Sequence, residues 1–120
     1  MKKNYLVTGG TGFIGSAIVR HLVNKGFNVS VIDNNQRGSL HRLKDIRNKI
    51  KFIKVDIRDK LKIIKACRNI NTIIHLAYVN GTEFFYSKPE LVLDIAVKGM
   101  SNILDAAIKN KVKNFVLASS

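Results

Sequence analysis

The chain has 120 residues, of which 46% are hydrophobic and 24% are charged. This length allows one domain, and the composition excludes a disordered chain. No apolar run approaches the roughly 20 residues of a membrane-spanning helix, and the N-terminus lacks the long apolar region of a secretory signal. We therefore expect no membrane association and a cytoplasmic protein.

The formal net charge is +13, from 21 Lys and Arg against 8 Asp and Glu. Eleven of the basic residues lie between Arg42 and Arg68. A basic surface of this size is compatible with nucleic-acid binding, but no recognition helix accompanies it, and the chain is rich in Lys, Asn and Ile together. This composition favours a solvated basic surface over a nucleic-acid site.

Five short apolar runs, rich in β-branched residues, alternate with helical patterns along the chain. This alternation predicts an α/β fold with a parallel sheet, and the nearly continuous apolar runs are typical of strands covered on both faces. The predicted strands are Tyr5–Thr8, Val29–Asp33, Lys51–Val55, Thr72–Leu76 and Phe115–Ala118.

Four helices are predicted between these strands. The first is marked by apolar positions at spacings of three and four and ends at Gly26, and a shorter second helix follows the 34–39 loop. A third helix runs from about Asp59 to Arg68, and the fourth from Pro89 or Glu90 to about Lys109, since proline suits the first turn. The positions that define them are Ile14, Ala17, Ile18, His21 and Leu22; Leu40, Leu43 and Ile46; Leu61, Ile64, Ala66 and Cys67; and Leu93, Ala96, Val97, Met100, Ile103, Leu104 and Ala107.

Right-handed crossovers place the strands in the order 3-2-1-4-5, which is a Rossmann-type doubly wound sheet. The fifth strand ends the chain and would leave an apolar sheet edge exposed. We therefore expect residues 1–120 to be one incomplete domain, truncated after the fifth strand of a longer protein. The one cysteine, Cys67, is predicted to be a buried small hydrophobe, and the scattered histidines predict no metal site.

A glycine-rich turn joins the first strand to the first helix. Glycines at these positions allow a tight turn, a close approach of the backbone to a pyrophosphate, and close packing of helix on strand, while the amides of the helix N-terminus face the anion. The segment is Thr8-Gly9-Gly10-Thr11-Gly12-Phe13-Ile14-Gly15. Its position at a strand-to-helix junction predicts a dinucleotide site.

Asp33 ends the second strand, 18 residues after Gly15. A carboxylate there accepts hydrogen bonds from the adenosine ribose and repels a 2′-phosphate, which favours NAD over NADP. Arg37, four residues further on, could offset this preference by binding a phosphate.

These motifs together resemble the NAD-dependent epimerase/dehydratase family of extended short-chain dehydrogenases/reductases, which act on nucleotide sugars. The resemblance covers the whole chain. It rests on the glycine turn, Asp33-Asn34, Asp56-Ile57-Arg58-Asp59, His75-Leu76-Ala77 and Ala118-Ser119-Ser120.

The resemblance implies roles for individual residues. Phe13 and Ile14 would contact the pyrophosphate through backbone amides, Asp56 would bind the adenine amino group, and Ile57 would pack on its ring. An alternative role for Asp56, and the one we favour for Asp59, is to cap the third helix. The complete predicted cofactor set is Gly9, Gly12, Phe13, Ile14, Gly15, Asp33, Asn34, Asn35, Arg37, Gly38, Asp56, Ile57, Leu76, Ala77 and Tyr78.

His75 is interpreted as a core histidine rather than a catalytic residue. The polar loop that follows, with Asn80 to Glu83, either contacts a sugar or is an ordinary surface loop. One residue departs from the family pattern: Ala96 stands where members commonly carry an asparagine three residues before a glycine.

The resemblance also implies a catalytic serine or threonine after the fifth strand and a Tyr-x-x-x-Lys pair beyond it. Ser120, rather than Ser119, is the predicted hydroxyl. No tyrosine here has lysine four residues later, so the pair would lie beyond residue 120. The implied parent is a homodimeric NAD-dependent epimerase or dehydratase with a nucleotide-sugar substrate. A non-catalytic dinucleotide-binding regulator and a reductase of another substrate are the alternatives.

Overall fold

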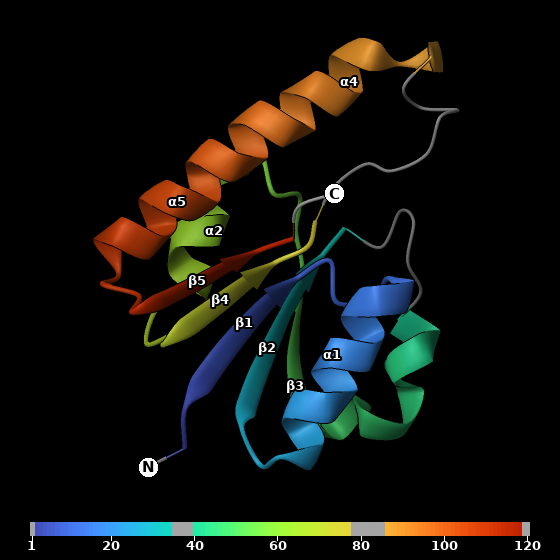
Figure 1. The fold of residues 1–120 in the computed structure, drawn as a ribbon, viewed down its shortest axis with the longest axis vertical. Coiled ribbons are helices and arrows are strands. Elements are labelled where there is room, and N and C mark those ends of the chain that lie inside the picture. The colour runs from blue at the N-terminus through green and yellow to red at the C-terminus, as the bar shows by residue number, and fades with distance from the viewer. Residues whose placement is uncertain (1, 35–39, 78–85, 119–120) are drawn as a thin grey trace.

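Five parallel strands form one sheet in the order β3-β2-β1-β4-β5 (Figure 1). The structure, a computed structural model, describes residues 2–34, 40–77 and 86–118. The predicted order is confirmed, and every strand lies within one residue of its predicted bounds. The strands are β1 (Asn4–Thr8), β2 (Asn28–Asp33), β3 (Ile50–Lys54), β4 (Thr72–His75) and β5 (Asn114–Leu117).

Helices cover both faces of the sheet. The helix α1 (Phe13–Asn24) and the 3-10 helix η1 (Leu40–Lys49) lie on one face, and α2 (Lys60–Ala66) and α5 (Met100–Lys109) lie on the other (Figure 1). Successive residues of a strand point to opposite faces, so each strand supplies side chains to both cores. This explains why the strands are apolar throughout rather than alternating.

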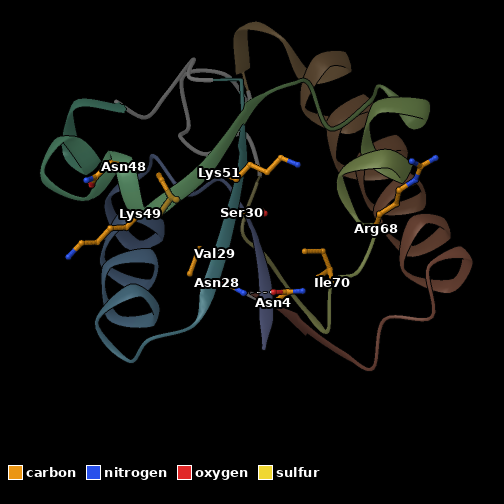
Figure 2. A pocket seen from close by; sticks show the side chains of 10 residues that line it. Asn4, Asn28, Val29, Ser30, Asn48, Lys49, Lys51, Arg68 and Ile70 are labelled. Atoms are coloured by element: carbon orange, nitrogen blue, oxygen red, sulfur yellow. Dashed lines mark hydrogen bonds between the residues drawn. The ribbon is translucent and has the colours of Figure 1, made fainter. Parts of the chain in front are cut away.

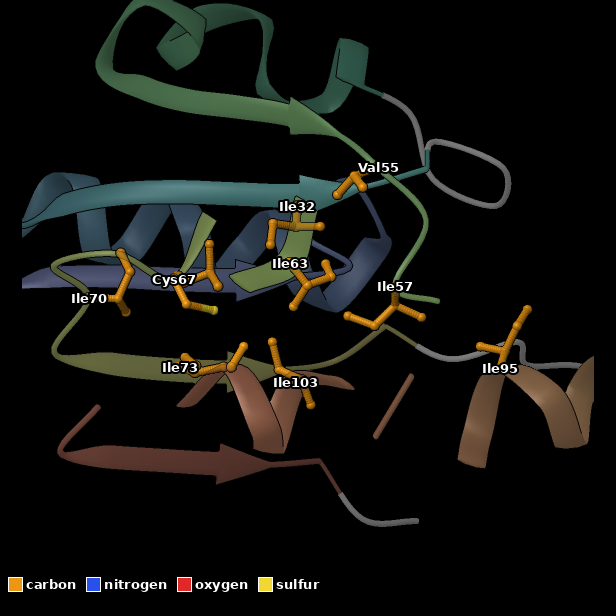
Figure 3. Packing of buried hydrophobic residues seen from close by; sticks show 11 residues of the cluster. Ile32, Val55, Ile57, Ile63, Cys67, Ile70, Ile73, Ile95 and Ile103 are labelled. Atoms are coloured by element: carbon orange, nitrogen blue, oxygen red, sulfur yellow. The ribbon is translucent and has the colours of Figure 1, made fainter. Parts of the chain in front are cut away.

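The two cores are built on the central strand. Leu6 of β1 packs into the core under α2 and α5, with Ile63, Ile73 and Ile103, all fully buried (Figure 3). The next residue, Val7, packs into the opposite core under α1. Cys67 is also fully buried, as predicted, and burial raises the pKa of its thiol to about 12.

The segment after β2 is helical, as predicted. It is a 3-10 helix that continues to Lys49, with Leu43 and Ile46 buried beneath it. Its apolar residues recur at every third position, which matches the three residues per turn of a 3-10 helix. The third helix begins as predicted, because the Asp59 carboxylate accepts a hydrogen bond from the Lys62 amide at 3.3 Å.

The predicted fourth helix comprises α4 (Pro89–Asp94), a π-helical turn η2 (Ile95–Gly99) and α5. The extent predicted from the sequence is confirmed. The π turn is a local widening of the helix, of a kind often found near functional sites.

The faces that these helices bury agree with the predicted ones only in part, since Leu22, Cys67 and Ile103 are buried as predicted but other predicted positions are exposed. In α2, Leu61 is 75% exposed whereas Ile63 is fully buried. Along the fourth helix, Leu93 and Val97 are exposed, and in α1 Ile14 is 67% exposed. These helices carry apolar residues on two sides, so periodicity alone cannot decide which side meets the sheet. The residues that pack inward are Val19 and Leu22 of α1, Ile63 of α2, and Val92, Ile95, Ile103 and Ala106 of the fourth helix.

Candidate functional site

The glycine turn lies over the carboxyl ends of β1, β2 and β4. Gly9 adopts a left-handed conformation with φ +73°, and a Cβ atom there would lie 3.0 Å from the Ala77 backbone nitrogen. Its own amide donates to the Ile32 carbonyl at 2.8 Å. The turn is therefore in close contact with the ends of the two neighbouring strands, which is where ligands bind in open α/β sheets.

The turn leads directly into α1. The first i to i−4 hydrogen bond of this segment runs from the Ser16 amide to the Gly12 carbonyl at 2.9 Å. The amides of Phe13, Ile14 and Gly15 therefore belong to the first helical turn, where no preceding helical carbonyl can accept from them. The side chains of Phe13 and Ile14 are 83% and 67% exposed. This arrangement presents amides and the positive end of a helix to an anion.

Thr11 connects this turn to two other elements. Its amide donates to Asp33 Oδ2 at 3.0 Å, and its carbonyl accepts from Arg42 Nη1 at 2.9 Å. Asp33 is 9% exposed at the end of β2, and Asn34 follows it, partly exposed. The predicted ribose ligand thus also braces the glycine turn through one carboxylate oxygen.

The Thr11 side chain is fully buried, and its Oγ1 has no hydrogen-bond partner in the described part of the chain. A buried hydroxyl without a partner is uncommon in proteins, and its position between the turn and Asp33 suits a polar ligand or a bound water.

A second polar group lies under the turn, at the end of β4. Thr8 Oγ1 accepts from the amides of Leu76 and Ala77 at 2.9 and 3.0 Å, and it lies 2.7 Å from His75 Nδ1. Because both lone pairs of the oxygen are used, the Thr8 hydroxyl donates to Nδ1, which requires an imidazole without a proton at that nitrogen. Burial lowers the pKa of His75 to about 4, in agreement with a neutral ring.

His75 is therefore a core residue, as predicted. Leu76 and Ala77 follow it at the carboxyl end of β4, both partly buried, at the sheet edge where they are predicted to line the cofactor.

The segment after β3 forms an ion-pair network with α4. Arg58 donates from its amide and Nε to Asp56 Oδ1, at 2.9 and 3.0 Å, and from Nη2 to Oδ2 at 2.7 Å. Its Nη1 donates to Asp94 Oδ2 at 2.9 Å. These hydrogen bonds hold the pKa of both carboxyl groups below their usual range and raise that of Arg58.

This network and the packing around it limit the contacts that Asp56 and Ile57 can make with the adenine of a cofactor. The Asp56 carboxylate is oriented by Arg58 and keeps only its remaining lone pairs for a ligand. The Ile57 side chain is 6% exposed and lies in the core, which leaves little of it to pack on a ring. Its carbonyl accepts from Asn102 Nδ2 at 3.1 Å, so its backbone is held against α5.

Several predicted site residues lie outside the described ranges. They are Asn35, Arg37, Gly38, Tyr78 and both serines of the chain end, Ser119 and Ser120. The 80–83 loop segment lies outside them as well. Within the described residues, no three His, Cys, Asp or Glu gather into a metal site, and no helix is long and apolar enough to cross a membrane.

Sequence reasoning missed the roles of Thr11, Arg42 and Arg58. Arg58 could have been found, because an arginine two residues after an acid can pair with it locally. Arg42 lies 31 residues from Thr11, and nothing in the sequence indicates that the two meet.

Known proteins resemble this chain in sequence and in fold. The sequence profile of the NAD dependent epimerase/dehydratase family matches residues 5–120. The UDP-N-acetyl-alpha-D-glucosaminuronate decarboxylase of Bacillus cytotoxicus is 33% identical over 120 residues, which are 100% of this chain and 37% of that protein.

Two solved structures share the fold closely. The UDP-glucose 4-epimerase of Thermus thermophilus in complex with NAD superposes with a TM-score of 0.89 at 33% identity, over 98% of this chain and 37% of that one. The dTDP-glucose 4,6-dehydratase DesIV of Streptomyces venezuelae, with NAD and TYD bound, gives a TM-score of 0.87 at 26% identity, over 93% of this chain and 38% of that one. The chain therefore spans a little over a third of the length of these proteins.

Proposed function

The chain belongs to the NAD-dependent epimerase/dehydratase family, and from this membership we propose that it is the cofactor-binding part of a nucleotide-sugar epimerase or dehydratase. The observation that carries the proposal is the glycine turn, whose helix-start amides and bracing carboxylate are arranged as a dinucleotide site. The similar proteins named above include an epimerase, a dehydratase and a decarboxylase, all acting on sugars linked to nucleoside diphosphates.

The residues of the turn fit NAD. A Cβ atom at Gly15 would lie 2.1 Å from the Gly9 carbonyl oxygen, so the first helical turn packs as closely on the glycine turn as a bare backbone permits. This packing presents the Phe13 and Ile14 amides together for a pyrophosphate.

Asp33 supports a preference for NAD over NADP. Its carboxylate lies at the end of β2, next to the glycine turn whose Thr11 amide donates to Oδ2, and a carboxylate at this place accepts hydrogen bonds from the ribose hydroxyls of NAD. A 2′-phosphate in the same place would put a dianion against a carboxylate that is 9% exposed. Repulsion at short range in a partly desolvated site is large enough to exclude it.

When bound, NAD supplies the hydride acceptor for oxidation of a sugar carbon. Residues 2–118 orient it: the turn holds the pyrophosphate, Asp33 holds the ribose, and Leu76 and Ala77 line the path along the sheet edge. Ser120 is the proposed hydroxyl that orients the reacting sugar oxygen. The tyrosine–lysine pair that removes the proton, and the part that binds the nucleotide sugar, belong to the remainder of the protein, so the chain alone is inactive.

Homodimerisation is part of the same proposal. The long helix buries one apolar face against the sheet and carries a second row on its outer side, at positions 93, 97, 104 and 108. The exposed fractions of Leu93, Val97, Leu104 and Ile108 are 65%, 59%, 41% and 77%. Such a row on one helix marks a surface for protein contact, and a second copy offers the identical row. A cytoplasmic location also follows as a proposal, since the phosphate charges of NAD and nucleotide sugars keep both molecules from crossing membranes unaided.

The test compares NAD and NADP on the whole protein by calorimetry. Wild type should bind NAD more tightly than NADP. Asp33→Asn, which keeps an oxygen for the Thr11 amide but removes the charge, should narrow that preference. Asp33→Ala, which also removes the brace, should weaken both cofactors. An unchanged preference in Asp33→Asn would refute the ribose assignment, and absence of NAD binding to wild type would refute the cofactor proposal.

A further inference from the structure

The end of the sheet opposite the cofactor site is uniformly basic. We define the amino edge as the strand starts and the last residues of the connections that lead into them, residues 2–3, 25–27, 47–49, 67–71 and 110–113. A cation lies within four residues before every strand: Lys3, Lys25, Lys49, Arg68 and Lys113. None of the acidic residues that the structure describes lies in these connections.

A hollow of about 390 Å³ lies in this edge, beside β2 and β3. Figure 2 shows Lys51 on the β3 side of the hollow and Arg68 on the α2 side, with Ser30 between them. Three of its lining residues are cations, Lys49, Lys51 and Arg68, and no Asp or Glu lines it.

The floor of the hollow is polar and fixed. The Asn28 side-chain amide donates to Asn4 Oδ1 at 2.9 Å, and Asn4 Nδ2 donates to the Asn69 carbonyl at 2.7 Å (Figure 2). These hydrogen bonds join the starts of β1 and β2 to the turn before β4. The buried side chains of Val29, Ile50 and Ile70 complete the lining.

Two of the three charges at this hollow, Lys51 and Arg68, form no ion pair in the described part of the chain, whereas Arg20, Arg58, Lys60, Lys62 and Lys98 all do. Clustered like charges repel one another and produce a positive potential that concentrates anions in a concave surface.

We propose that this hollow is a second binding site, for a small phosphate-bearing anion, at the end of the sheet away from the cofactor. Arg68 supplies a planar fork that matches two phosphate oxygens, and Lys51 supplies a point charge from the opposite wall. The concave shape and polar floor favour a small anion, which can enter the hollow, over a macromolecule, which would bind to the surface around it.

The experiment is calorimetric titration of the full-length enzyme with inorganic pyrophosphate and, separately, with ADP, at physiological salt. The protein is first saturated with NAD, so that the glycine turn cannot take up the probe. The test variant is Lys51→Gln/Arg68→Gln. The matched control is Lys44→Gln/Lys109→Gln, which removes the same charge at exposed positions that do not line the hollow.

Wild type and the control should bind pyrophosphate or ADP alike, and the test variant about tenfold more weakly, a factor that corresponds to about 1.4 kcal/mol. If pyrophosphate binds more tightly than ADP, the ligand is a free oligophosphate. If ADP binds more tightly than pyrophosphate, the ligand is a nucleotide. The proposal is overturned if neither probe binds wild type, or if both variants lose binding equally. It is also overturned if only a single-stranded oligonucleotide binds, with the steep salt dependence of nucleic-acid contacts.

Discussion

The glycine turn has two roles that alanine substitutions should distinguish. Gly15→Ala tests the packing of the helix on the turn, and Gly12→Ala tests the approach of the ligand to the backbone. At Gly15 the added Cβ would lie 2.1 Å from the Gly9 carbonyl oxygen and 3.0 Å from Gly10 Cα. Since a carbon–oxygen contact is normally about 3.3 Å or longer, the helix or the turn must move by about 1 Å. Both contacts are backbone atoms, which cannot rotate away.

The free energy of unfolding should therefore fall by about 1–3 kcal/mol in Gly15→Ala, the usual cost of an extra methyl in a packed region. At Gly12 the Cβ would lie 3.4 Å from the same oxygen, and φ is −73°, which any residue adopts. Stability should change there by only about 0.5 kcal/mol. The new methyl would, however, stand where the pyrophosphate approaches the amides, and NAD affinity should fall about tenfold or more.

Urea unfolding monitored by circular dichroism measures the loss of stability in Gly15→Ala. NAD titration of the whole protein measures the loss of affinity in Gly12→Ala. Equal stability of the two variants would show that the helix does not pack on the turn as described. Wild-type NAD affinity in Gly12→Ala would show that the pyrophosphate does not approach the backbone at that residue.

Three further predictions follow from individual contacts. Arg42→Ala should raise KM for NAD about fivefold with kcat nearly unchanged, because the Thr11 carbonyl loses a charged donor. Arg42→Lys should restore part of the loss in KM. Steady-state kinetics of the whole enzyme would contradict this prediction if kcat fell instead of KM rising. The pKa of His75 is about 4 when folded and about 6.5 when unfolded, so protons bind the unfolded state preferentially and stability should fall by about 2 kcal/mol between pH 7 and pH 5. Urea titrations at both pH values would measure this decrease in the free energy of unfolding. If the same decrease occurs in His75→Gln, another titrating group causes it. Leu104→Glu should give a monomer by light scattering, whereas Lys109→Glu, at an exposed position off this row, should leave the dimer intact. A wild-type monomer would refute the dimer proposal.

The strands and their order were predictable because each strand is a short β-branched run and crossovers between parallel strands have one hand. The glycine turn and Asp33 were predictable for a similar reason: both lie at strand ends, and such ends converge at one edge of the sheet. Asp59 as a helix cap depends only on its neighbours, and it too was predicted correctly.

The helix faces were only partly predictable: Leu22 and Ile103 are buried as predicted, but the second apolar side of each helix has no partner visible in the sequence. Val92 and Leu93 are adjacent and equally apolar, yet one is 7% exposed and the other 65%. Only the position of the sheet decides between them. Contacts between distant polar residues, such as Arg42 with Thr11 or Arg58 with Asp94, depend likewise on how elements pack.

The hydrogen bond between Asp33 and the Thr11 amide has a consequence for engineering the enzyme. A substitution such as Asp33→Ala, which removes the acceptor together with the charge, also releases the middle of the glycine turn. A redesign towards NADP therefore needs two simultaneous changes: a cation near the end of β2 to receive the phosphate, and a neutral acceptor at position 33 to keep the loop in place. A single mutation that removes the acceptor along with the charge will lower the affinity for both dinucleotides.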